Sequence, residues 1–171
     1  MDLPKRKHNR LQGFDYSTPG AYFITVCVKD RKNLLSRIVG GGALDAPQNR
    51  LTEAGEIVNR YILGGNQIPG VNVEKYVIMP NHVHMILLVD KGAAGGTSWS
   101  PSPTNGVVPH FISTWKRFCH KALGRKIFQR SYHDHVIRSE ADYLKIWEYI
   151  DTNPIKWKED CFYNEEEARY E

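Results

Sequence analysis

The sequence predicts an α+β fold of the ferredoxin-like (split βαβ) type: an antiparallel sheet with helices on one face, plus a C-terminal helix. Hydrophobic periodicity follows the order strand, helix, strand, strand, helix, strand, which is the order of that fold. With 171 residues, 41% hydrophobic and 25% charged, the chain has the size and composition of a single domain, residues 1–171. We expect a polar lead-in over residues 1–20 and a tail over residues 155–171.

The first elements are predicted from residue type and from the positions of glycines and helix-capping residues. Residues 21–28 are rich in β-branched and aromatic side chains, which favours a central strand. Residues 40–49 begin with three glycines and predict a flexible loop without a phosphate-binding pattern. Thr52 is a suitable cap for a helix with Glu53 and Glu56 in its first turn, and Gly64 and Gly65 end that helix.

Two apolar runs, residues 73–79 and 82–89, flank a Pro-Asn turn and predict a pair of strands. His82 and His84 are two positions apart on the second strand, so both imidazoles point to the same face. Two imidazoles on one stiff strand form half of a divalent metal site. A half-exposed sheet face without a metal is the simpler alternative.

The second half of the chain predicts a loose loop at 91–106, a helix at 108–123 and a strand within 127–137. Ser139 can cap a last helix that runs to about Thr152, because Pro154 prevents its continuation. The expected core of the 108–123 helix is Phe111, Ile112, Trp115, Phe118, Cys119, Ala122 and Leu123. Tyr149 lies on the polar side of the last helix, where it and Asn153, at i and i+4, can face one cleft.

Charge is distributed unevenly, although the net charge is only +4. No Asp or Glu occurs between Lys91 and His133. Such segregation predicts an electropositive face for a nucleic acid, and a solvated surface is the alternative. The expected DNA-binding residues are Lys116, Arg117, Lys121, Arg125, Lys126 and Arg130, with Lys5, Arg6 and Lys7 near the N-terminus.

Cysteine usage and hydropathy predict a cytoplasmic protein with no membrane segment. The three cysteines are odd in number and widely spaced, which favours neither a disulfide framework nor a zinc motif. No apolar run approaches the roughly 20 residues that a membrane span needs. The first residues also lack the apolar core of a secretory signal.

Two motifs resemble a known family. Residues 79–84 (Met-Pro-Asn-His-Val-His) resemble the His-hydrophobe-His signature of HUH single-strand nucleases, and residues 149–154 (Tyr-Ile-Asp-Thr-Asn-Pro) resemble the tyrosine helix of small single-tyrosine (IS200-like) transposases. The whole arrangement is most similar to REP-associated tyrosine transposases. Further similar stretches are residues 13–16, 21–25, 132–138 and 153–157.

The resemblance implies a metal-dependent single-strand DNA endonuclease and strand transferase acting on hairpin-associated DNA as a monomer or homodimer. It implies that His82, His84 and Asn153 bind one Mg²⁺ or Mn²⁺, and that Tyr149 attacks the phosphate to give a 5′-phosphotyrosine. The shorter Asn153 stands where related enzymes have Gln. Lys145, one turn before the tyrosine, and His135 are possible supporting residues.

Other functions remain open from the sequence. One alternative is a domesticated nucleic-acid-binding protein of the same fold with little or no catalysis. A second is HUH chemistry used in replication initiation or plasmid relaxation, although relaxases usually place the tyrosine before the histidines. A third is a metal-dependent hydrolase that uses water, with Tyr149 incidental.

Overall fold

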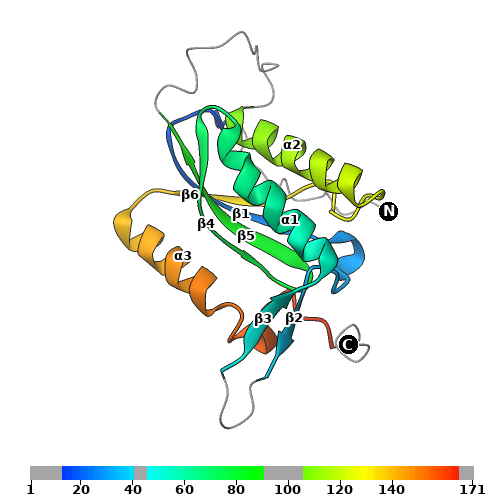
Figure 1. Cartoon of the computed structure of the whole chain (residues 1–171). Coiled ribbons are helices and arrows are strands. Elements are labelled where there is room, and N and C mark those ends of the chain that lie inside the picture. Colours follow the sequence, from blue (N-terminus) through cyan, green and yellow to red (C-terminus); the bar gives the residue numbers. More distant parts are fainter. Residues whose placement is uncertain (1–12, 41–45, 91–105, 166–171) are drawn as a thin grey trace, which may run out of the picture.

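The computed structural model describes residues 13–40, 46–90 and 106–165. A four-stranded antiparallel sheet has the order β4-β5-β1-β6, with β1 at Gly20–Cys27, β4 at Val71–Ile78, β5 at His82–Val89 and β6 at His133–Ile137. β5 is paired along its length with β1 on one side and β4 on the other (Figure 1). This order and the helix connections confirm the predicted ferredoxin-like fold.

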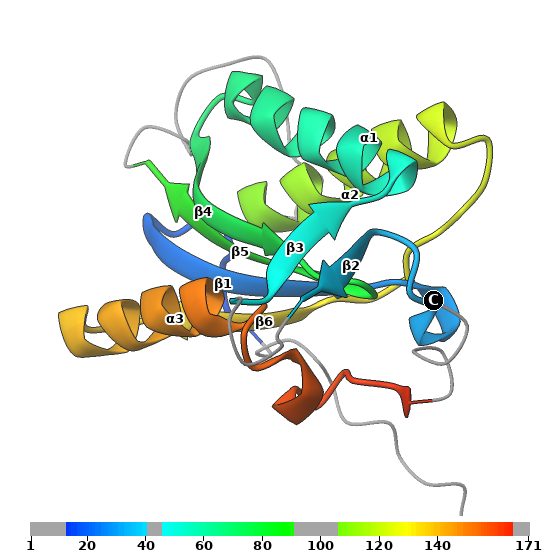
Figure 2. The ribbon, with the colours of Figure 1, turned by 60° about the horizontal axis from the view of Figure 1, so that its bottom comes forward.

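Helices cover both faces of the sheet (Figure 2). α1 (Glu53–Leu63) and α2 (Val107–Ala122) lie on one face, over the larger hydrophobic core. α3 (Glu140–Thr152) lies on the opposite face, where Ile146 and Ile150 pack with Ile86 of β5. The predicted caps are confirmed, because Thr52 and Ser139 each accept a backbone N–H three residues further on. None of the helices in the described part of the chain is long and apolar enough to cross a membrane.

A two-stranded hairpin between β1 and α1 was not predicted. β2 (Ser36–Val39) pairs with β3 (Gln48–Leu51), so the prediction of a loop through residue 49 is wrong at its C-terminal end. Residues 41–45, in the middle of that predicted loop, lie outside the described residues. Each of these strands has only four residues, too few for an alternating pattern to be distinct.

Hydrogen bonds fix this hairpin to the turn between β4 and β5. The backbone N–H groups of Leu34 and Leu35 both donate to the carbonyl of Pro80, at 2.9 Å each. The side-chain amide of Asn49 in β3 donates to the carbonyl of Ile78 at 2.8 Å. The hairpin is therefore held at the end of the sheet where β5 begins with His82.

The strand predicted within residues 127–137 is confirmed at His133–Ile137, and Phe128 makes an isolated bridge with Val28. The predicted core of α2, in contrast, needs correction. On α2, Phe118 was predicted to be in the core but is 43% exposed and stacks on Tyr61 of α1. Ala122 is exposed as well, whereas Phe111, Ile112, Trp115 and Cys119 are buried as predicted. Short helices complete the described chain at Lys29–Arg31, Gly64–Gln67 and Trp157–Glu159.

Candidate metal and tyrosine site

The two predicted histidines begin β5 and point to the face that α3 covers. His82 and His84 are 0% and 1% exposed, and their ring centroids are 4.4 Å apart. In the register of β1 and β5, His84 lies opposite Thr25 and His82 opposite Cys27. Strand alternation therefore places both imidazoles on one side, as predicted.

Asn81 determines the tautomer of His82. Its side-chain NH₂ group donates to the carbonyls of Arg31, at 3.2 Å, and Phe162, at 2.8 Å, so its Oδ1 must be an acceptor. That Oδ1 is 2.9 Å from Nδ1 of His82, which consequently carries the proton. Nε2 of His82 is left with a lone pair, is buried, and has no hydrogen-bond partner among the described residues. A cation is the partner that such a nitrogen fits.

His84 is held in a similar way. Its Nδ1 lies 2.8 Å from Oγ1 of Thr25, and its ring stacks on Phe23 with centroids 5.2 Å apart. Burial lowers the pKa of both histidines, that of His82 to about 3 with the Arg31 charge as a second cause. Both rings are therefore neutral near pH 7, which is the form that binds metal ions.

Tyr149 reaches this site from α3. Its hydroxyl group donates to Oδ2 of Asp160 at 3.0 Å and lies 3.3 Å from Nε2 of His84. The side chain is 38% exposed, so solvent reaches it more readily than the histidines. Burial, and then the negative charge of Asp160, raise the pKa of the phenol above its usual value.

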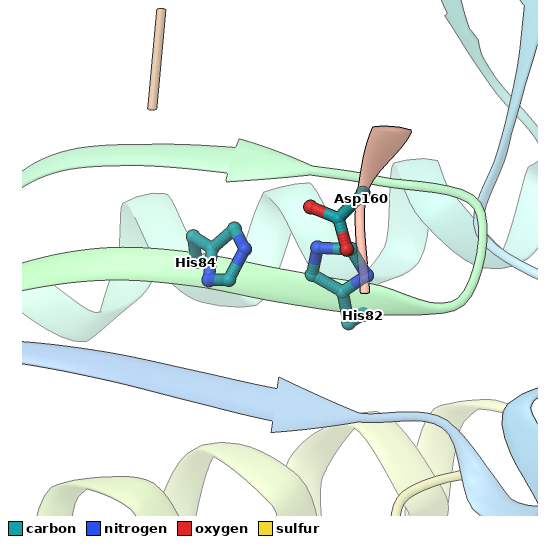
Figure 3. Close-up of side chains that lie close together, drawn as sticks. All are labelled: His82, His84 and Asp160. Carbon is teal, nitrogen blue, oxygen red and sulfur yellow. The ribbon is translucent and has the colours of Figure 1, made fainter. Parts of the chain in front are cut away.

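Asp160 was missed by the sequence analysis. It lies beyond α3 in an irregular segment, and Figure 3 shows its carboxylate beside His82 and facing the histidine pair. One ligand atom each from His82, His84 and Asp160 lie within 4.8 Å of one another. The carboxylate is held by the backbone N–H of Phe162, which donates to Oδ1 at 2.7 Å. No periodic pattern marks an acidic residue in such a segment, so only the folded chain reveals it.

Asn153 also joins the cluster, as expected from its position one turn after Tyr149. Its NH₂ group donates to Oδ2 of Asp160 at 2.7 Å, and the side chain is 2% exposed. Its Oδ1 is buried and has no hydrogen-bond partner within the described residues. Two imidazole nitrogens, a carboxylate and an orphaned amide oxygen are a donor set that fits a divalent cation.

Aromatic side chains from the C-terminal segment cover the histidines. The rings of Phe162 and Trp157 lie 4.7 and 5.9 Å from that of His82, measured between centroids. Arg31 places its guanidinium 5.3 Å from the centroid of Phe162. The turn before Arg31 is strained, because Asp30 and Arg31 have φ values of 60° and 54°. Side chains from two segments, the C-terminal one and the turn at Arg31, therefore cover this side of the site.

The predicted supporting residues lie outside the cluster. Lys145 is exposed on α3, and it is Asp160 that contacts the phenol. His135 is exposed on β6 and lies 2.7 Å from the carboxylate of Asp142, at the start of α3. His135 therefore connects β6 to α3.

The predicted DNA-binding residues divide into three groups. Lys116 departs from the prediction of an exposed side chain: it is 7% exposed, and its ammonium donates to the carbonyls of Gln129, Arg130 and Ser131 at 2.9–3.5 Å. Lys5, Arg6 and Lys7 lie outside the described residues. The exposed members are Arg117, Lys121, Arg125, Lys126 and Arg130.

No protein-family model matches the sequence. An uncharacterized protein of Haemophilus influenzae is 30% identical over 178 residues, which cover 92% of this chain and 93% of the relative. A REP-associated tyrosine transposase of Escherichia coli K12 is 23% identical over 145 residues, 82% of this chain and 70% of the relative.

The fold is also found among solved structures. A REP-associated tyrosine transposase, solved bound to a REP hairpin, superposes with a TM-score of 0.60 at 21% identity, over 86% of this chain and 74% of the other. At this identity the superposition shows a shared fold. The chain thus belongs to one family with the Haemophilus influenzae protein, and it resembles REP-associated tyrosine transposases in sequence and in fold.

Proposed function

We propose that the protein is a transposase that nicks and rejoins single-stranded DNA with the help of a metal ion. The observation that carries this proposal is the position of the Tyr149 hydroxyl, 3.3 Å from Nε2 of His84 and 3.0 Å from Asp160. A nucleophile beside a cluster of candidate metal ligands is an arrangement that suits metal-assisted phosphodiester cleavage through a covalent intermediate. The similarity to REP-associated tyrosine transposases supports the same function.

The proposed metal ligands are His82, His84, Asn153 and Asp160; the last is supported by ligand atoms of His82, His84 and Asp160 within 4.8 Å of one another. Mg²⁺ or Mn²⁺ held there would polarise the scissile phosphate and offset the negative charge that develops on it. Thr25 and Asn81 hold the two imidazoles with Nε2 toward the site. A positive charge in this position would also oppose the effect of Asp160 on the pKa of Tyr149.

Tyr149 performs the covalent step. Its phenol proton has an acceptor in place, Oδ2 of Asp160, and the phenol oxygen then forms a bond to phosphorus. The bond from phosphorus to the 3′-oxygen breaks, and this oxygen takes up a proton from solvent, which leaves a 5′-phosphotyrosine and a 3′-hydroxyl. One phosphate ester replaces another, so a 3′-hydroxyl can reverse the step and rejoin a strand without an external energy source.

The proposed substrate is single-stranded or hairpin DNA. The structural relative is solved with a REP hairpin, and this chain exposes a group of arginines and lysines on and after α2, with no acidic residue between Lys91 and His133. Basic side chains of this kind bind phosphates in any sequence context. We propose a monomer or a homodimer as the active species.

The test is the formation of a covalent adduct. Labelled hairpin and single-stranded DNA from the flanks of the gene would be mixed with the full chain and Mn²⁺ or Mg²⁺, and then run on a denaturing gel. We expect a slowly migrating DNA-protein band that needs the metal ion and is absent with Tyr149→Phe. Tyr163→Phe is the matched control, because Tyr163 lies in the same C-terminal part of the chain but packs on Trp157.

The other outcomes identify the alternatives. Cleavage without an adduct would indicate a hydrolase that uses water, with Tyr149 incidental. Binding without cleavage across several flanking sequences would indicate a domesticated DNA-binding protein. Either result would overturn the phosphotyrosine mechanism.

A further inference from the structure

The hairpin of β2 and β3 carries two arginines directly opposite each other. In its register Arg37 pairs with Arg50, so both side chains are on the same face of the ribbon. Both are exposed, and together with Val39, Leu51 and Thr52 they line a shallow hollow. Like charges at directly opposite positions destabilise an antiparallel pair, and a ribbon of two short strands has little stability to spare.

Nothing acidic compensates for this repulsion in the part of the chain that the structure describes. No carboxylate there lies within 4.0 Å of either guanidinium, and the ion pairs found are Lys75 with Asp151 and His135 with Asp142. Arg50 has a neutral partner, Oε1 of Gln48, at 3.3 Å. Two neighbouring guanidinium groups on an exposed face are a fitting site for an oxyanion, because each presents several donors in a planar fork.

The hairpin is placed beside the candidate active site by the bonds at its base. Leu34, Leu35 and Asn49 are hydrogen-bonded to the turn at residues 78–80 that leads directly into His82. In Figure 1 the hairpin extends beyond the end of the four-stranded sheet. Strand alternation turns Arg37 and Arg50 to the face of the ribbon opposite Asn49. An anion held by them would therefore occupy a fixed place on the outer face of this hairpin, next to the turn that leads into His82.

We propose that Arg37 and Arg50 bind backbone phosphates of the DNA strand that enters the active site. This inference rests on the proposed function, and it adds a binding surface separate from the basic residues of α2. The pair weakens the free hairpin, and a phosphate relieves the repulsion once DNA is bound. The arginines touch the DNA backbone, so they orient the strand and do not select its sequence.

The experiment measures DNA affinity and protein stability on the same variants. Arg37→Gln with Arg50→Gln removes both charges, and Arg37→Glu places a carboxylate opposite Arg50. Arg60→Gln on α1 is the charge-matched control, because Arg60 is exposed and α1 lies on the face of the sheet opposite the two histidines. Binding of labelled single-stranded and hairpin DNA would be followed by fluorescence anisotropy at several salt concentrations, and thermal unfolding would be followed without DNA.

We expect the double Gln variant to bind DNA about tenfold more weakly, with a log K versus log salt slope that is smaller by about 0.7 for each phosphate that the variant no longer binds. Its melting temperature should be equal to that of the wild type or higher, and that of Arg37→Glu should be higher. Arg60→Gln should bind as the wild type does. Unchanged affinity and salt slope in the double variant would overturn the inference, and so would a fall in affinity that follows a loss of folding.

The two proposals fail in different ways. A wild-type chain that binds DNA but forms no adduct would reject the phosphotyrosine mechanism and still permit the arginine measurement. An adduct that forms equally in the wild type and the double Gln variant, with equal DNA affinity, would reject the role of the hairpin alone. A wild-type chain that binds neither single-stranded nor hairpin DNA would reject both.

Discussion

The phenol oxygen of Tyr149 on α3 lies 3.3 Å from Nε2 of His84 on β5, although the two residues are 65 positions apart. The packing of α3 maintains this distance, because Ile146 and Ile150 are buried against Ile86, two positions after His84. The hydrophobic contacts of one helix therefore determine whether the side chains of Tyr149 and His84 meet.

Truncation of Ile150 should loosen that packing. Ile150 is 2% exposed, so Ile150→Ala should lower the free energy of unfolding by about 2–4 kcal/mol and reduce adduct formation even where the protein remains folded. Leu144→Ala on the same helix is the control, since Leu144 is 58% exposed and should change stability by less than about 0.5 kcal/mol. Urea unfolding and single-turnover cleavage would be measured together. Equal adduct formation in the two variants would show that α3 does not position the tyrosine.

Asn81 should matter for metal binding as well as for stability. Asn81→Ala leaves Nδ1 of His82 and the carbonyls of Arg31 and Phe162 without their partner, which should cost about 1–3 kcal/mol and lower Mn²⁺ affinity about 10–100-fold. Asn72→Ala is the control, because among the described residues the Asn72 amide donates to Glu74 alone, at 3.4 Å. Isothermal titration with Mn²⁺ would measure the affinity. Wild-type affinity in folded Asn81→Ala would contradict the role given to this amide.

The parts of the site that follow a local period could be predicted from the sequence. His82 and His84 share a face through the two-residue period of a strand, and Tyr149 and Asn153 lie close through the helical i, i+4 relation. Asp160 could not be predicted, because it lies in an irregular segment after α3 and approaches His82 and His84 only in the folded chain. A contact of this kind depends on tertiary structure alone.

The buried face of a helix could be predicted less well than the helix itself. Phe118 and Lys116 are close together on α2, and hydropathy alone assigns the aromatic to the core and the cation to solvent. The structure reverses both, because Lys116 meets a group of carbonyls from the 129–131 segment and Phe118 meets Tyr61 across an exposed groove. Contacts with distant segments therefore determine that Lys116 is buried and that Phe118 is exposed.

Removal of the Asp160 charge should weaken the metal site. Asp160→Asn keeps the size of the side chain but replaces an anionic oxygen ligand with a neutral amide, so the gain in melting temperature on adding Mn²⁺ should become smaller. Asp151→Asn is the control, since Asp151 is bound to Lys75 on β4 and lies outside the cluster. A wild-type Mn²⁺ shift in Asp160→Asn would exclude Asp160 from the ligands and leave Asn153 as the third.

Stability without metal should fall as the pH is lowered through the range of the buried histidines. The pKa of His82 is about 3 in the folded protein and about 6.5 in the unfolded chain, so the unfolded chain binds more protons between these values. Unfolding free energy should thus be fully retained above about pH 6.5 and decrease as the pH falls toward 3. His82→Gln should flatten this dependence in EDTA, and His133→Gln on β6 is the exposed control. Parallel curves for the wild type and His82→Gln would contradict the buried neutral state.

Lys116 should stabilise the fold more than it contributes to DNA binding. Its ammonium is the donor to three carbonyls at residues 129–131, so Lys116→Met would leave partly buried acceptors without this donor and should cost about 1–3 kcal/mol. Lys121→Met on the same helix is the matched control, because Lys121 is exposed and should change stability by less than about 0.5 kcal/mol while it weakens DNA binding. Lys116→Met should therefore lower stability more than Lys121→Met does, and Lys121→Met should weaken DNA binding more than Lys116→Met does. A Lys116→Met protein with wild-type stability would show that the carbonyls find other donors.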